Sequence, residues 1–438
     1  MKTLLVGGGG REHALAWAMR RRGSLADLLL LPGNPGMSAL GHRIEGVEPT
    51  DVGAVAAVAA AQAVDLVVVG PEAPLAAGLT DALRSRGIPA FGPSRAAARL
   101  ESSKSYAKEV MKSAGVPTAE AAVFDDATAA HDHIRRAVGP FVVKADGLAA
   151  GKGVLVTDEV DAAHRWVDRC FQGDFGSAGS TVLIEDFLAG PEVSVFAMCA
   201  GRAAVTLAPA RDYKRLLDAD LGPNTGGMGA FSPVPDLPAG LVDTIRDTVV
   251  LPVLTELDER GDQYTGFLYA GLVLTDDGPQ VLEFNCRLGD PEAQVVLPRL
   301  EDDLVEVMLG ALNGSLPEAL QWSPQAAVDV VLATAGYPDE PRIGDPITGS
   351  DAVADLDDVL LFHAATTGDD RRPLTAGGRV LNVVGLGEDL AAARRRAYEA
   401  VELVRFPGMT YRNDIGAVNS PVSATGTVPL PQQRSVSA

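Results

Sequence analysis

The stretch EFNCRLGDPE at residues 283–292 decides how the rest of the chain is interpreted. It completes a pattern of two apolar runs, at residues 267–274 and 280–285, which are separated by a turn containing Asp277 and Gly278. An Asp-Gly pair between two apolar runs is a strong signal for a β-hairpin. We therefore expect the stretch to begin in the returning strand of a hairpin and to continue past its end.

Side chains along that strand alternate between two faces, so Val281, Glu283 and Asn285 are expected to share one face. A carboxylate and an amide oxygen then lie side by side, and the cation Arg287 follows two residues later. Oxygen ligands of this kind suit a Mg²⁺ ion that keeps most of its shell for water and substrate phosphates. An arginine there can bind the same phosphates or a substrate carboxylate. The alternative is an ordinary hairpin with a polar end.

Length and composition narrow the class of protein. The 438 residues suffice for two to four domains, and 47% apolar and 22% charged residues are typical of a globular, soluble chain. A net charge of -21 argues against nucleic-acid and anionic-membrane partners, and no apolar run reaches 18 residues. The three cysteines are far apart, which indicates neither a zinc site nor a disulfide framework and favours the reducing cytoplasm.

Residues 1–100 alternate strands with helices, which predicts a parallel, doubly wound sheet. Glycine-containing loops follow the strands, and all should face one crevice beyond the strand ends. The loop at residues 7–10 lacks the third glycine of a dinucleotide fingerprint, and no acidic residue ends the second strand, so a nicotinamide enzyme is disfavoured. A glycine turn before a helix still offers backbone N–H groups to one phosphate; tight strand–helix packing is the alternative.

A second module begins near residue 101. Its sequence KADGLAAGKG at residues 144–153 lies between two apolar runs, which predicts a glycine-rich flap whose Lys144 and Lys152 reach phosphates. A further strand leads into an acidic and aromatic linker at residues 185–192, which can hold an adenine edge, with Glu192 on the ribose. Taken singly, these lysines would be interpreted as surface residues. In this order, the lysines, the flap and the linker predict a nucleotide-binding site.

The ordered motifs resemble the ATP-grasp ligases and, within them, the phosphoribosylamine–glycine ligase family. The usual GNGG turn of the family is GGGG here, and Leu288 stands where a phenylalanine is usual. Arg211 stands where relatives commonly have a neutral residue, so the resemblance implies no role for it. The resemblance extends to about residue 416. It is carried by GGGREHA (8–14), PGNPG (32–36), GPEAPL (70–75), KADGLAAGKG (144–153), GPNTGGMG (222–229), TGFLYAG (265–271) and EFNCRLGDPE (283–292).

The resemblance implies an α/β chain with an N-terminal doubly wound parallel-sheet domain (1–100), an ATP-grasp fold of two α+β subdomains (101–325, flap about 118–190) and a small C-terminal α/β domain (326–416). Residues 417–438 have the composition of a disordered tail. The implied reaction joins glycine to 5-phosphoribosylamine through glycyl phosphate. Another ATP-grasp carboxylate–amine ligase and a nucleotide-binding regulator without turnover are the alternatives. A monomer or weak homo-oligomer is expected.

The resemblance also implies roles for individual residues, with ATP and Mg²⁺ or Mn²⁺ as cofactors. The glycine-rich loop at residues 222–229 is expected to be floppy unless a small substrate orders it. Catalytic roles fall on Arg287, Asp212 and Lys214, and metal binding falls on Glu283 and Asn285. ATP binding falls on Lys104, Lys144, Gly151, Lys152, Gly153, Glu185, Phe187, Leu188 and Glu192. Substrate binding falls on Gly9, Gly10, Glu12, Asn34, Gly36, Pro71, Glu72, Asn224, Thr225, Gly226, Gly227, Met228, Asp290 and Glu292.

Overall fold

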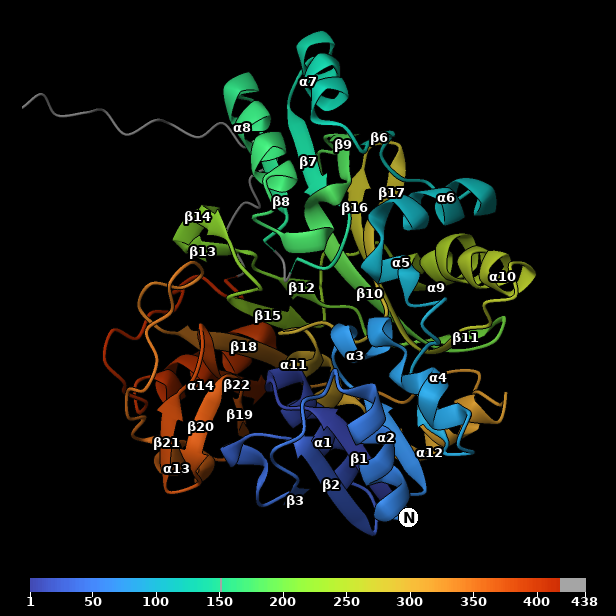
Figure 1. Ribbon diagram of the computed structural model, residues 1–438. Helices are drawn as coiled ribbons and strands as arrows, with labels where there is room; N and C mark the ends of the chain where they lie inside the picture. Colours follow the sequence, from blue (N-terminus) through green and yellow to red (C-terminus); the bar gives the residue numbers. More distant parts are fainter. Residues whose placement is uncertain (150–151, 418–438) are drawn as a thin grey trace, which may run out of the picture.

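The first part of the chain forms the predicted parallel sheet. The computed structural model describes residues 1–149 and 152–417 (Figure 1). The sheet has the order β3-β2-β1-β4-β5 with parallel neighbours. One face packs on α1 and the other on α2 to α4, so the doubly wound arrangement is confirmed. The elements are β1 (Lys2–Gly7), α1 (Gly10–Arg20), β2 (Asp27–Pro32), β3 (His42–Arg43), α2 (Val52–Ala61), β4 (Leu66–Val69), α3 (Glu72–Ala77), α4 (Leu79–Arg84) and β5 (Ala90–Phe91).

The flap subdomain is a separate antiparallel sheet in the order β6-β9-β7-β8. Its helices α7 and α8 lie at the top of Figure 1, and their apolar faces pack against the sheet around Phe141 and Val167. The apolar side chains on one face of these strands therefore pack with the two helices into a separate small core. The elements are α5 (Arg99–Ser102), α6 (Lys104–Ala114), β6 (Ala121–Phe124), α7 (Ala127–Arg136), β7 (Phe141–Ala145), β8 (Val154–Thr157), α8 (Val160–Phe171) and β9 (Val182–Asp186).

The predicted hairpin belongs to a second antiparallel sheet, in the order β11-β10-β16-β17. Its strands are β10 (Glu192–Ala200), β11 (Ala203–Thr206), β16 (Thr265–Thr275) and β17 (Gly278–Asn285). Glu283 lies opposite Gly271 and Asn285 opposite Tyr269, so these two side chains share a face as predicted.

The prediction that Val281 lies on the same face as Glu283 was wrong. Val281 pairs with Leu272, whereas Glu283 pairs with Gly271, so Leu282 is an extra residue in a β-bulge. The bulge breaks the period-two alternation, and Val281 packs in the apolar core together with Phe284. Core and site therefore stay on opposite faces despite the irregular spacing.

The C-terminal domain is built on a sheet with the order β12-β15-β18-β22-β19. Two of its strands, β12 and β15, come from the chain segment before the C-terminal domain, and a hairpin of β13 and β14 separates them along the chain. The elements are β12 (Arg211–Asp212), β13 (Arg215–Leu217), β14 (Leu221–Asn224), β15 (Gly229–Ser232), β18 (Ala326–Ala333), α13 (Ser350–Ala354), β19 (Val359–His363), β20 (Thr366–Asp369), β21 (Arg372–Thr375), β22 (Arg379–Gly387) and α14 (Leu390–Val401).

Several helices join these sheets into one body. Residues of α1, α11 and α12 share an apolar cluster with strands of the N-terminal parallel sheet and of the β11-β10-β16-β17 sheet. Within residues 1–149 and 152–417, no helix has both the length and the apolar character needed to cross a membrane. The remaining helices are α9 (Leu241–Ile245), α10 (Leu251–Glu259), α11 (Ala293–Val296) and α12 (Leu304–Leu312).

Candidate active site

Three lysines gather beside the hairpin, and two of them pair with one carboxylate. The Ser103 hydroxyl accepts a hydrogen bond from the Tyr106 N–H and begins α6, which places Lys104 and Lys108 one turn apart on this helix. Lys144 on β7 lies 2.8 Å from Glu185, and Lys108 lies 3.4 Å from it. Lys104 instead donates to the carbonyl oxygens of Ala145 (2.9 Å) and Gly147 (3.0 Å). This cluster carries more positive than negative charge.

The Glu283–Asn285 pair has the donor chemistry of a hard-cation site. Burial would raise the pKa of Glu283, but the ammonium groups of Lys144, Lys104 and Lys214 outweigh it and lower that pKa. Glu283 forms no ion pair within 4.0 Å among the described residues. An ionised carboxylate and an amide oxygen on one face fit a divalent cation that takes its remaining ligands from water and phosphate.

The predicted adenine linker begins at Glu185 and leaves the sheet at the end of β9. Glu185 is buried, and its Oε1 has no hydrogen-bond partner among the described residues. Phe187 is 42% exposed, and Leu188 is half-buried. An unpaired acceptor near the end of β9 and an exposed aromatic ring two residues later are groups that can bind an adenine base.

The predicted flap residues are not gathered at one point. Lys152 donates to the Pro338 carbonyl in the C-terminal domain (2.8 Å) and makes no contact with Lys144. The Gly153 carbonyl accepts from the Ala145 N–H (2.8 Å), which continues the pairing of β7 with β8. Gly151 lies outside the described residues. Lys152 therefore connects the flap to the C-terminal domain.

Arginines and carboxylates alternate where the first domain meets the hairpin. Arg287 lies 2.8 Å from Glu101 and 3.3 Å from Glu72, and it also donates to the Asn285 Oδ1 (3.1 Å). Arg11 pairs with Glu72 (3.7 Å) and with its neighbour Glu12 (2.6 Å). Burial would raise the pKa of Glu72, but Arg287 and Arg11 lower it to about 2. The arginines fix the position of Asn285 and hold the two domains together.

The glycine turn at residues 7–10 packs closely around one carboxylate. Gly7 has φ +123°, and a Cβ there would lie 2.4 Å from the Glu12 Cγ, so only glycine fits. Glu12 accepts from the Gly9 N–H (2.8 Å), as in a capping box. A Cβ on Gly10 would meet the amides of Asn382 and Gln294 at 2.5 and 2.7 Å. The start of α1 is therefore lined by carboxylate and amide groups.

Other loops of the first domain lie against the same turn. Asn34 donates to the Gly8 carbonyl and to the His363 carbonyl, both at 2.9 Å. Gly36 lies against the rings of His363 and His13. The Pro71 ring would be 3.0 Å from a Cβ on Gly7, and Glu72 begins α3 directly after it. The structure thus brings together the substrate residues that were predicted in three separate loops.

Asp212, Lys214 and Glu292 form a second cluster. Lys214 lies 2.8 Å from Asp212 and 2.7 Å from Glu192. Burial would lower the pKa of Lys214, but the two carboxylates raise it well above its ordinary value. Burial and the charge of Asp212 raise the pKa of Glu292 to about 7, although Lys214 opposes them. Glu192, which was predicted to hold a ribose, is here the partner of Lys214.

The loop expected to be floppy is held by the protein's own hydrogen bonds. Asn224 ends β14, and the Thr225 N–H and hydroxyl both donate to the Lys214 carbonyl, at 2.7 and 2.8 Å. A Cβ on Gly227, where φ is +110°, would meet Pro291 at 2.5 Å. Met228 is fully buried. The loop is therefore a shaped surface between the Lys214 cluster and the C-terminal domain.

Two functional candidates, Arg379 and Tyr337, were not predicted. Arg379 lies 3.3 Å from the Asp290 carboxylate and donates to the Asp290 carbonyl (2.7 Å) and the Gly226 carbonyl (2.5 Å). The Tyr337 hydroxyl accepts from the Gly226 N–H (2.9 Å). Gly-Gly before Arg379 was the sequence signal for a strand start; nothing local indicated Tyr337. Both belong to the C-terminal domain and anchor the glycine loop.

Arg211 was left without a predicted role, and the structure gives it a packing role. It donates to the Glu192 carbonyl (3.0 Å) and pairs with Asp236 (2.8 Å), and its guanidinium lies over the Phe231 ring. Adjacent strand residues point to opposite faces, so Arg211 points away from the face of Asp212.

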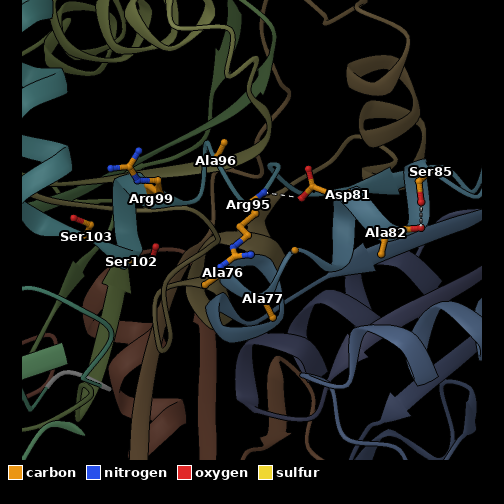
Figure 2. Close-up of a pocket in the computed structure, with 11 residues that line it drawn as sticks. Ala76, Ala77, Asp81, Ala82, Ser85, Arg95, Ala96, Arg99, Ser102 and Ser103 are labelled. Atoms are coloured by element: carbon orange, nitrogen blue, oxygen red, sulfur yellow. Dashed lines mark hydrogen bonds between the residues drawn. The ribbon is translucent and has the colours of Figure 1, made fainter. Parts of the chain in front are cut away.

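A surface groove of about 890 Å³ lies between α3–α4 and the segment that leads into α6. Figure 2 shows Arg95, Arg99, Asp81 and Ser103 along it. None of the predicted site residues lines this groove. Cavity volume alone would therefore misplace the site, which is defined by converging charges and loops.

Comparison with known proteins covers nearly the whole chain. Family models of phosphoribosylglycinamide synthetase match its N domain (residues 1–101), ATP-grasp domain (102–293) and C domain (327–418). A phosphoribosylamine–glycine ligase of Ralstonia nicotianae is 48% identical over 419 residues, which are 95% of this chain and 99% of that protein. The corresponding ligase of Streptomyces coelicolor is 47% identical over 421 residues, 95% of this chain and 99% of that protein.

Solved structures show the same arrangement. The crystal structure of the Thermotoga maritima phosphoribosylamine–glycine ligase matches with a TM-score of 0.82 and 37% identity, over 94% of this chain and 100% of that chain. The biotin carboxylase domain of a Hydrogenobacter thermophilus 2-oxoglutarate carboxylase, solved with MgADP, matches with a TM-score of 0.72 at 16% identity over 94% and 91% of the two chains. The second likeness extends to the fold alone.

Proposed function

This chain belongs to the phosphoribosylglycinamide synthetase family and joins glycine to phosphoribosylamine in purine biosynthesis, and we propose that it does so through a glycyl phosphate intermediate. An ATP-grasp enzyme uses ATP with a divalent metal. We propose Mg²⁺ as that metal, and the cytoplasm as the compartment because all three cysteines are free thiols.

One observation supports the reaction most directly. Among the described residues, Lys108 and Lys144 share the carboxylate of Glu185, Lys104 donates to backbone carbonyls, and the ionised Glu283 stands beside these lysines. Excess positive charge next to an anionic metal ligand suits a triphosphate, whose negative charge grows on the leaving oxygen during phosphoryl transfer. A divalent cation held by Glu283 and Asn285 would neutralise the transferred phosphoryl group.

The chain's own residues position the reactants. An oxygen of the glycine carboxylate attacks the γ-phosphorus, ADP leaves, and Lys104 and Lys144 hold the phosphate oxygens. The amine of phosphoribosylamine then attacks the acyl carbon, and inorganic phosphate leaves. Arg287 holds the Asn285 amide in place (3.1 Å), and the flap excludes water that would hydrolyse the intermediate. Asp212, Lys214 and the loop at residues 222–229 orient the glycine and the amine.

Isotope transfer tests the intermediate. Glycine that carries heavy oxygen in its carboxyl group should yield inorganic phosphate with one labelled oxygen per turnover, because that oxygen leaves with the phosphoryl group. The amide product should keep the other labelled oxygen, as mass spectrometry of both products would show. Normal amide formation with unlabelled phosphate would contradict the glycyl phosphate. ATP hydrolysis without glycine serves as the unlabelled control.

A further inference from the structure

The hairpin of β13 and β14 has little support from its own sheet. It has only two strands, and the facing residues Leu217 and Leu221 at its end are 53% and 51% exposed. An isolated two-stranded hairpin is marginally stable in water. Its turn also contains Ala219 and Asp220 with φ of +56° and +54°, a conformation unfavourable for residues with a side chain. Contacts outside the hairpin must therefore hold it.

Those contacts come from a short C-terminal segment, residues 412–414, which we term the clamp. The Asn413 N–H and side-chain amide both donate to the Asp218 carboxylate, at 2.7 and 3.0 Å. The Ala219 N–H donates to the Asp414 carboxylate (2.9 Å). Arg412 lies 2.7 Å from the Asp220 carboxylate. All three turn residues 218–220 are therefore held by charged or amide groups of the clamp.

Arg412 is the central residue of the clamp. Its side chain is 1% exposed, donates to the Arg215 carbonyl (3.1 Å) and lies over the Tyr213 ring at 4.7 Å. Its carbonyl accepts from the Tyr398 hydroxyl (2.7 Å), which ties the clamp to α14 in the C-terminal domain. Asp414 pairs with the same guanidinium at 2.6 Å. The clamp therefore connects a packed helix to a hairpin that has no core of its own.

The other end of the hairpin enters the active site. Tyr213 lies between Asp212 and Lys214, and its hydroxyl accepts from the Gly416 N–H (3.0 Å). Its backbone pairs with Gly229 and Met228, while Thr225 bonds to the Lys214 carbonyl. A shift of the hairpin would therefore move Lys214 and Thr225 together.

We propose that Arg412, Asn413 and Asp414 are positioning residues for ligation: they hold the β13–β14 hairpin so that Lys214 and the glycine loop stay in place for the small substrates. This inference rests on the proposed function. Within the described residues, Lys104 and Lys144 make no hydrogen bond or ion pair with the clamp or with the hairpin, so ATP binding should be independent of the clamp.

The double variant Asp218→Ala/Asp220→Asn tests the clamp from the exposed hairpin side and leaves Arg412 paired with Asp414. Losing the two hydrogen bonds to the Asp218 carboxylate and the ion pair of Asp220 with Arg412 should raise the KM for glycine or phosphoribosylamine about tenfold, with the KM for ATP within about twofold. Amide hydrogen exchange at residues 215–225 should quicken about tenfold. The variant Asn413→Ala removes the side-chain amide bond to Asp218 from the other side and keeps the backbone bond, and it should change both quantities in the same direction.

The matched control is Asp355→Asn/Asp357→Asn, which removes the same charge from exposed residues of the C-terminal domain. It should leave exchange and all Michaelis constants unchanged. Unchanged hydrogen exchange in both clamp variants overturns the proposal, as does faster exchange with unchanged substrate constants. An equal rise in all three Michaelis constants also overturns it, because that marks a general loss of structure. A parent enzyme that fails to ligate contradicts the proposed function itself.

Discussion

The two sides of the crevice balance their charges differently. On the flap side, Lys108 and Lys144 share one ion-pair partner among the described residues, Glu185, and Lys104 donates to backbone carbonyls. On the first-domain side, Arg11 and Arg287 share three carboxylates, on Glu12, Glu72 and Glu101. The lysine side therefore has positive charge available for an anionic ligand, whereas the arginine side is fully compensated.

The pKa shifts show the same contrast. Burial lowers the pKa of Lys104, although the negative charge of Glu283 acts to raise that pKa. Burial also opposes the charge of Arg287, but Glu101 and Glu72 raise its pKa above the ordinary value. Burial disfavours the charged form of such a lysine, and a phosphate that binds beside it stabilises that charged form. A compensated arginine instead contributes to the structure that holds the domains together.

Removing the charge of Glu283, the proposed metal ligand on the lysine side, should have the largest effect. We expect Glu283→Gln to lower kcat by at least about 10³-fold, because the site then offers the metal no charged ligand. Folding and ATP binding should persist, as thermal unfolding and nucleotide titration would show. Glu318→Gln, at an exposed position, is the control. Comparable kcat at saturating Mg²⁺ would contradict the metal assignment.

Replacing one cation on each side by an uncharged methionine tests the contrast directly. Arg287→Met should reduce the free energy of unfolding by about 3 kcal/mol, because it leaves Glu101 buried without its ion-pair partner and leaves Glu72 with Arg11 alone. Lys104→Met should change that free energy by less than about 1 kcal/mol while lowering turnover at least about 100-fold. Urea unfolding and steady-state kinetics measure the two quantities. Equal destabilisation by both substitutions would remove the distinction between the two sides.

The Glu292 carboxyl adds a pH dependence. Its pKa is raised from 4.5 to about 7 by burial and Asp212, so the folded state holds its proton more tightly than the unfolded state. The stability it contributes is present below about pH 4.5 and is lost as the pH rises through 7. The free energy of unfolding of Glu292→Gln, measured relative to the parent, should therefore rise by about 2–3 kcal/mol between pH 4.5 and 8. A constant difference across that range would contradict the shifted pKa.

The smallest expected effect concerns the glycine turn of the compensated side. A Cβ on Gly10 meets the flexible ends of Asn382 and Gln294, which can move, so Gly10→Ala should fold. It should raise the KM for phosphoribosylamine about threefold to tenfold, and change those for ATP and glycine less. Gly23→Ala, which meets no atom within 4 Å, is the control. Equal changes in all three constants would contradict the assignment of this turn to phosphoribosylamine.

Local signals predicted most of the fold. Apolar runs and turn residues located β1, β2, β7, β16 and β17 to within about two residues, and the resemblance supplied their assembly. The bulge at Leu282 escaped prediction because a period-two pattern assumes unbroken pairing. The membership of β15 in the C-terminal sheet was also missed, because strand partners far apart in sequence leave no local pattern.

The candidate site was predicted as a set of motifs rather than as a set of contacts. Loops that follow parallel strands must meet at one edge, which is why Asn34, Pro71 and Glu72 were grouped correctly around the turn. Arg379 and Tyr337 reach the site from a domain whose sequence carries no recognisable ligand motif. Charge compensation was likewise invisible, since it depends on which carboxylate lies beside which cation.

The placement of β15 also constrains how the chain can be made and divided. This strand is synthesised nearly a hundred residues before its partner β18, and its backbone pairs with that strand through Gly229 to Val330 and Ser232 to Ala327. A ribosome-bound chain that ends before β18 therefore presents β15 as an open sheet edge, which is prone to pairing with other chains. For the same reason, fragments cut near residue 325 should be soluble only together, each completing the other's sheet.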